Sequence, residues 1–199
     1  MKRLTVALLL VAFPSLVWAQ KIGVLAFEDA ANVGPQLGEQ VAKFIRSELL
    51  KNKKYVPKFI QYKAEEGEST SIDFEKAVEL GKKNGVDYVM IGTILEAEAT
   101  KSSAGVGNVN VFGQQLGSSL RTVSATITIQ GDLISVSTGK LIDSYRATGS
   151  KTDRSVAADV STEWGSLNTD GEASGNTPNV QALREAVEEL VKQMPKELQ

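Results

Sequence analysis

The segment VDYVMIGTIL, residues 86–95, is the most strand-like stretch of the sequence, since most of its residues are apolar, β-branched or aromatic. Two earlier segments resemble it, the continuous apolar run KIGVLAF at 21–27 and the segment YVPKFI at 55–60. A short continuous apolar run is typical of a strand buried on both faces. Pro57 cannot donate a backbone hydrogen bond, which places the 55–60 strand at a sheet edge or a bulge.

Amphipathic helices are expected between these strands. Apolar residues at helical spacing over 35–50 predict the first helix. The second follows Ser71 or Asp73, either of which can cap it, and ends at Gly85. Strands that alternate with helices in this way build crossover units and a parallel sheet.

The second half of the chain changes in pattern. Residues 122–135 alternate between apolar and polar side chains, which predicts a half-buried strand. The turn sequence STGK at 137–140 and the segment 141–147 predict a hairpin partner for it. Apolar residues at helical spacing over 180–194 predict a closing amphipathic helix.

The expected fold class is therefore α/β, a single domain with a mixed β-sheet and packed helices in the order β-α-β-α-β-β-β-α. Two inserted hairpin or loop segments interrupt it, at 98–120 and at 148–179. Residues 1–19 carry two basic residues, a short apolar run and a final alanine, the layout of a cleaved signal peptide. We expect residues 20–199 to form the exported domain, in the periplasm or associated with the outer membrane.

The composition excludes several kinds of site. The 199 residues include no histidine and no cysteine, so a Ser-His-Asp triad, a thiolate nucleophile and a zinc site of thiolates or imidazoles are ruled out. A formal net charge of -2 argues against nucleic-acid binding. No pattern marks a Ser-Lys dyad, and the glycines at 105 and 107 lack the rest of a dinucleotide fingerprint. We predict no enzymatic activity, no catalytic residue, no cofactor and no metal.

One acidic pair is a candidate site. Glu28 and Asp29 follow the first strand, at the edge where α/β folds often bind ligands. Paired carboxylates could exchange protons or hold a divalent cation. A solvated loop is the simpler interpretation, and we favour it because no further ligands cluster nearby in the sequence.

The two inserted segments carry the candidate interface residues. In the second, residues 155–164 alternate between an apolar and a polar face and end in an aromatic residue. That length and pattern suit a strand of a membrane β-barrel. They also suit a surface hairpin or a strand that covers the domain's own sheet. The pattern alone somewhat favours these two interpretations over the barrel strand. The candidates for a membrane or oligomer interface are Val106, Val109, Val111, Phe112, Val156, Val160 and Trp164.

Several of these segments resemble the curli secretion channel (CsgG) family of bacterial envelope proteins. The matching motifs are IGVLAFE at 22–28, GVDYVMIGT at 85–93 and LISVSTGKL at 133–141, together with the closing helix. The resemblance implies an α/β periplasmic domain without enzymatic activity, and a role in secretion or curli-type assembly and transport at the outer membrane.

The resemblance also implies partners. In the channel, two inserted hairpins per subunit join a multimeric barrel, which implies a homo-oligomer, an envelope or secreted protein partner and contact with the outer membrane. The alternative is a soluble periplasmic regulator that binds a cell-wall enzyme, similar to the peptidoglycan synthase activator LpoB. Both relatives carry a lipidated N-terminal cysteine, which this chain lacks.

Overall fold

The computed structural model contains three helices and a mixed sheet. It describes residues 19–34, 36–52, 54–62, 71–105, 109–111, 114–116, 119–156 and 177–195. The elements in chain order are β1 (Gln20–Leu25), β2 (Glu28–Asp29), α1 (Leu37–Lys51), β3 (Tyr55–Ile60), α2 (Phe74–Asn84), β4 (Tyr88–Gly105), β5 (Val109–Val111), β6 (Gln114–Leu116), β7 (Ser119–Ser135), β8 (Leu141–Val156) and α3 (Pro178–Gln193).

The main sheet has the strand order β3-β1-β4-β7-β8, with β2 beside β4. The pairs β1–β3, β1–β4 and β2–β4 are parallel, whereas β4–β7 and β7–β8 are antiparallel. This confirms the predicted α/β fold with a mixed sheet. The strand that contains Pro57 is an edge strand, as the proline requires.

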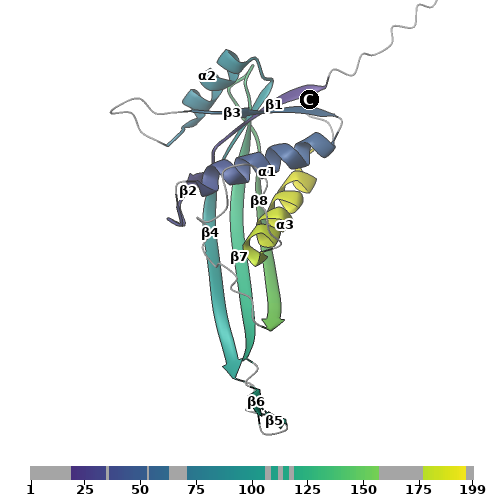
Figure 1. The fold of residues 1–199 in the computed structure, drawn as a ribbon. Helices are drawn as coiled ribbons and strands as arrows, with labels where there is room; N and C mark the ends of the chain where they lie inside the picture. The colour runs from purple at the N-terminus through teal and green to yellow at the C-terminus, as the bar shows by residue number, and fades with distance from the viewer. Residues whose placement is uncertain are drawn as a thin grey trace, which may run out of the picture.

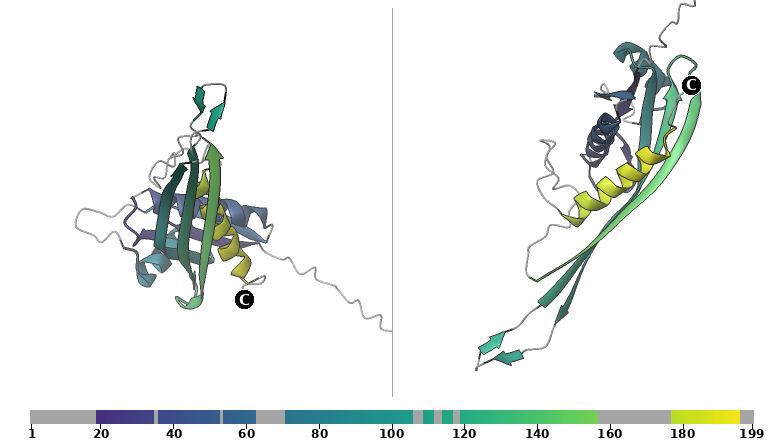
Figure 2. Two further views of the ribbon diagram at one scale, coloured as in Figure 1. Left: turned by 90° about the horizontal axis from the view of Figure 1, so that it is seen from below. Right: turned by 90° about the vertical axis from the view of Figure 1, so that its right-hand side faces the viewer.

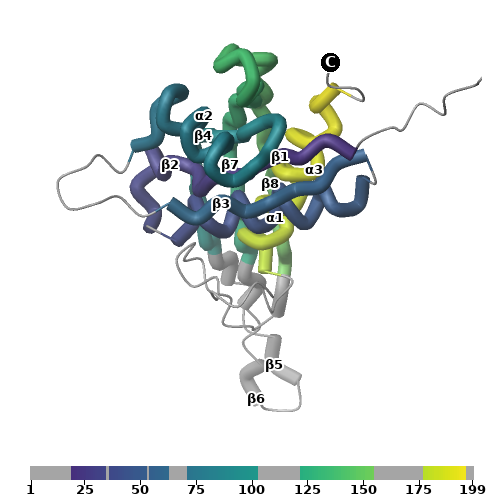
Figure 3. Tube along the Cα trace, turned by 90° about the horizontal axis from the view of Figure 1, so that it is seen from above, coloured from purple at the N-terminus to yellow at the C-terminus, as the bar shows by residue number. Residues whose placement is uncertain are grey.

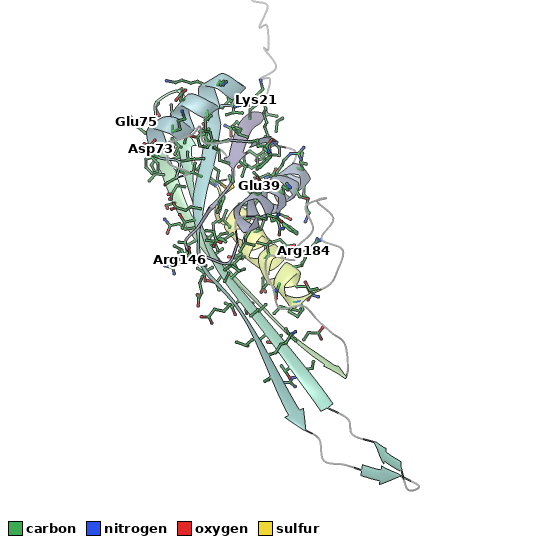
Figure 4. All side chains as sticks on the ribbon, turned by 60° about the vertical axis from the view of Figure 1, so that its left-hand side comes forward. Lys21, Glu39, Asp73, Glu75, Arg146 and Arg184 are labelled. Carbon is green, nitrogen blue, oxygen red and sulfur yellow. The ribbon has the colours of Figure 1, made fainter. Side chains whose placement is uncertain are left out.

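Local sequence signals set the ends of the helices. The Asp73 carboxylate accepts a hydrogen bond from the Lys76 backbone N–H at 2.8 Å and so caps α2 (Figure 4 labels Asp73). Gly85 ends α2 with a φ of 64°, a conformation that favours glycine. The Thr177 side chain caps α3 in the same way, through the Val180 N–H.

The helices lie on the two faces of the sheet. Helices α1 and α3 pack on one face (Figures 2 and 3), and their larger apolar cluster includes Val41, Ile45, Ile127 and Leu183. Helix α2 packs on the opposite face over a smaller cluster that contains Ile91. None of the helices in the described residues is long and apolar enough to span a membrane.

Three strands are much longer than the rest of the fold needs. Strands β4, β7 and β8 have 18, 17 and 16 residues, whereas most strands in globular proteins have about 3–10. At about 3.3 Å per residue they reach roughly 50–60 Å, and they project well beyond the helices (Figure 1). Beyond them, β5 and β6 pair with each other. The long strands run into both predicted insertions, whose boundaries, like the cleavage at residue 19, stay predictions.

Candidate functional site: a three-stranded ribbon

The projecting part of the sheet is the candidate site. We call residues 95–105 of β4, 119–130 of β7 and 146–156 of β8 the ribbon. Its register is continuous: each β7 residue from Leu120 to Thr128 faces one residue of β4 and one of β8. A bulge between Ile94 and Glu96 marks the point where β4 enters the ribbon.

The face of the ribbon toward α3, which we call the helix face, is apolar only near the body. Ile127 is fully buried there, and Gly149 beside it lies against the α3 backbone at Ala182 and Ala186. Further out this face becomes charged. The exposed side chains there are Lys101, Lys151 and Asp153, beside the half-buried Ala97 and Ala99 and the buried Val123 and Ala125.

The opposite face, which we call the open face, is polar. Hydroxyl groups link the strands: Ser124 pairs with Thr152 and Thr128 with Thr148, both at 3.0 Å. The Thr128 hydroxyl also donates to the Glu96 carboxylate at 3.2 Å. The polar side chains of this face are Glu96, Glu98, Thr100, Ser102, Thr122, Ser124, Thr126, Thr128, Gln130, Arg146, Thr148, Ser150, Thr152 and Arg154.

Charge is distributed unevenly across the open face. Glu96 and Glu98 lie on β4, whereas Arg146 and Arg154 lie on β8, and all four are exposed. Figure 4 shows Arg146 on β8 and Arg184 on α3. The ribbon therefore has an acidic border and a basic border, separated by the neutral hydroxyl groups of β7.

The β8 edge is covered near the body and uncovered further out. The Glu185 side chain of α3 accepts a hydrogen bond from the Ser150 N–H at 3.2 Å, and the Gln193 side chain donates to the Arg146 carbonyl at 3.0 Å. Backbone groups alternate in direction along a strand, so Thr152 and Arg154 also point their N–H groups away from β7. Within the described part of the chain, these two N–H groups have no partner.

The β4 edge has a similar transition. It pairs with β1 at residues 88–90 and with β2 at Thr93 and Ile94. From Leu95 onward, no strand in the described ranges pairs with the side of β4 that faces away from β7. In the part of the chain that the structure describes, both edges of the ribbon thus lack a partner strand, and such edges are a ready template for another strand.

The acidic pair Glu28 and Asp29 forms β2. One Asp29 carboxylate oxygen accepts hydrogen bonds from the N–H groups of Val33 and Gly34, at 2.9 and 2.8 Å, and thereby holds the loop before α1. The described residues contain no cluster of three metal-ligating side chains. Asp29 therefore has a structural role in this loop.

The candidate interface residues are placed only in part. Val109 and Val111 lie in β5, and Val156 is the last residue of β8. Val106, Phe112, Val160 and Trp164 lie outside the described residues, so the membrane or oligomer interface stays a prediction. The sequence interpretation missed the charged border residues, although Glu96 and Glu98 alternate directly after the strongest strand.

Comparison with known proteins agrees with this architecture. The family model of the curli production assembly/transport component CsgG matches residues 7–198. The chain belongs to the CsgG family. Family membership supports an envelope protein of assembly or transport.

Several solved structures resemble this chain at low sequence identity. The hypothetical protein CT253 from Chlamydia trachomatis is 14% identical, with a TM-score of 0.51 over 87% of this chain and 94% of that one. A PelC dodecamer from Paraburkholderia phytofirmans is 14% identical, with a TM-score of 0.48 over 87% of each chain. The LpoB C-terminal domain from Escherichia coli is 18% identical, with a TM-score of 0.40 over 69% and 87%. No curated protein matches the sequence.

Proposed function

We propose that this protein is an exported, non-enzymatic component of envelope assembly or transport, and that it works by associating with copies of itself through the ribbon. The observation that carries the proposal is a ribbon that extends far beyond the core and whose two edges have no partner strand among the described residues. Membership in the CsgG family supports the envelope role, and the absence of histidine and cysteine supports the lack of catalysis.

The partial cover of the β8 edge supports self-association. Natural proteins usually shorten, charge or cover exposed strand edges because such edges pair with other chains. Here α3 covers the edge at Arg146 and Ser150 through two side chains. The N–H groups of Thr152 and Arg154 point outward beyond this cover, which suits an edge that accepts a neighbouring strand.

The two borders of the ribbon are complementary. Strands β4 and β8 run in the same direction, since each is antiparallel to β7. The acidic β4 border of one copy can therefore lie parallel to the basic β8 border of the next. Such a head-to-tail contact uses two different surfaces, and repeating it gives a ring when the rotation closes.

The side chains of the ribbon suit contact in water. In the row Thr100–Ser124–Thr152 every residue is polar, and in the adjacent row on the helix face Lys101 and Asp153 flank Val123. Lipid-facing strand surfaces are apolar. We therefore assign membrane contact, where it occurs, to the predicted residues of the insertions and not to these rows.

The same observation favours a second candidate, a periplasmic regulator that binds a cell-wall enzyme through the ribbon. Fractionation of cells into soluble periplasm and outer membrane distinguishes the two candidates, and mass photometry of the purified exported protein gives its oligomeric state. The assembly role predicts a homo-oligomer in the outer-membrane fraction, with an N-terminus that begins after Ala19. A monomer confined to the soluble fraction would leave the regulator as the better candidate.

A further inference from the structure

A cavity of about 490 Å³ lies where β4 enters the ribbon. Its walls come from the β1–β2 segment, the residues before α2, and strands β4 and β7, and they include Phe27, Ile91 and Thr93. Three carboxyl side chains also line it, those of Glu28, Asp29 and Asp132, and no lysine or arginine is among its described lining residues. Its volume is in the range of specific binding sites, about 300–1,000 Å³.

The cavity and the acidic border of the ribbon form one continuous surface. Asp132 faces Ile91 across the β4–β7 pair, and further along the same open face come Glu96 and Glu98. From Thr93 to Glu98 the distance along β4 is roughly 17 Å, at about 3.3 Å per residue. Because β2 already pairs with Thr93 and Ile94, an added strand has the four residues from Leu95 to Glu98 to pair with.

The backbone of β4 can hold such a strand. The two-residue strand β2 already pairs in parallel with Thr93 and Ile94, which shows that this edge accepts an added strand. Directly after β2, the β4 edge is unpaired in the described part of the chain. Addition of a peptide strand gains affinity from main-chain hydrogen bonds and specificity from pockets for alternate side chains.

We propose that the cavity and the β4 edge at residues 95–98 together form a docking site for an extended basic segment of another protein. The backbone of the segment continues the sheet beside β2. One lysine or arginine side chain enters the cavity toward Asp132 and Glu28, and alternate basic side chains meet Glu96 and Glu98. This goes beyond the proposed self-association, because the occupant is a different polypeptide, which competes with a second copy for residues 95–98 of the β4 edge.

Charge complementarity selects this occupant. Five carboxylates lie along this track, those of Glu28, Asp29, Asp132, Glu96 and Glu98, and the described residues that line the cavity with the first three include no lysine or arginine. Each partly exposed charge pair contributes up to about 1 kcal/mol, or about fivefold in affinity. Several such pairs at two-residue spacing distinguish a basic strand from a neutral one.

The test uses a fluorescein-labelled peptide with the sequence Thr-Lys-Val-Lys-Val-Lys-Thr, blocked at both ends, and fluorescence anisotropy with the full exported protein. A control peptide has glutamine in place of each lysine. A second control keeps the lysines but carries N-methyl groups on alternate amides. It is made in two versions, one methylated on the odd-numbered amides and one on the even-numbered amides. We expect the lysine peptide to bind about 10-fold more tightly than either control, and to weaken as salt is added.

Protein variants locate the binding. Asp132→Asn and Glu98→Gln are each expected to weaken the lysine peptide about two- to fivefold, whereas Glu189→Gln, on the exposed side of α3, leaves its affinity unchanged. Thermal unfolding confirms that each variant folds. Equal binding of the glutamine or N-methylated peptide, or unchanged binding by Asp132→Asn and Glu98→Gln, would overturn the inference.

Glu98→Gln and one further variant, Thr152→Pro, separate this inference from the proposed function. If Glu98→Gln breaks up a homo-oligomer without weakening the peptide complex, the occupant of this edge is a second copy and the inference is wrong. If Thr152→Pro removes the oligomer while the lysine peptide still binds, the docking site holds independently of self-association.

Discussion

Replacement of Gly149 by alanine tests how α3 is held against the ribbon. A Cβ atom at Gly149 would lie 2.0 Å from the Ala182 carbonyl oxygen and 2.5 Å from the Ala186 nitrogen. Both are backbone atoms of α3, so no side-chain rotation relieves the clash. Ordinary contact begins near 3.4 Å, so the helix must retreat by roughly 1.4 Å, the difference between that contact and the closer distance.

The expected cost follows from what α3 buries. Leu183 and Leu190 are fully buried beneath the helix, and a retreat of this size opens their contacts with the sheet. Forcing extra atoms into a packed core costs about 1–3 kcal/mol, and we expect the upper end because the clash involves only backbone. Urea unfolding followed by circular dichroism measures the free energy of unfolding.

Gly131→Ala is the matched control. Gly131 lies on the neighbouring strand β7, but its added Cβ would meet only side-chain atoms, at 3.4 Å or more. Removing a glycine also restricts the unfolded chain, so we expect this variant to match the wild type or gain about 0.5 kcal/mol. Equal stability losses in the two variants, or no loss in Gly149→Ala, would refute the packing argument.

Three further changes test the body of the fold. Burial raises the pKa of Tyr145 to about 12, with a smaller contribution from Asp143, and the buried Tyr145 hydroxyl has no hydrogen-bond partner in the described chain. Because the folded pKa lies above the unfolded value of 10, the free energy of unfolding of the wild type should fall from pH 10 to 12. In urea titrations Tyr145→Phe should reduce that fall. At pH 7 the same change should cost no stability. Asp73→Ala should lower the free energy of unfolding by about 1 kcal/mol, since α2 loses its cap. Ile91→Ala should cost about 2–5 kcal/mol in the same assay, and a change within error would mean that β4 is not central.

The sequence predicted the body of the fold well because local signals and burial agree there. Apolar runs, helical spacing and caps each identified an element, and the structure places Asp73 and Gly85 at the ends of α2 as their chemistry requires. The parallel arrangement followed from the alternation of strands and helices, and the closing hairpin from the turn at 137–140.

The β4 part of the ribbon could not be predicted from local pattern. Residues 96–102 of β4 include Glu96, Glu98 and Lys101, and a strand that is polar on one face and charged at its end gives little hydrophobic alternation. What makes it a strand is its pairing with β7 over the whole length, a contact between residues distant in the sequence. The unpaired edges follow from strand order, which the sequence does not encode locally.

The central claim is that copies associate through the ribbon edge, and sedimentation velocity of Thr152→Pro tests it most directly. The Thr152 N–H points away from β7, so proline removes a donor for the neighbouring copy and keeps the β7–β8 ladder. Thr152→Ala controls for loss of the hydroxyl pair with Ser124. We predict an oligomer for the wild type and for Thr152→Ala, and a shift to monomer for Thr152→Pro. A wild-type monomer at all concentrations, or a Thr152→Pro variant that assembles like the wild type, would contradict the account.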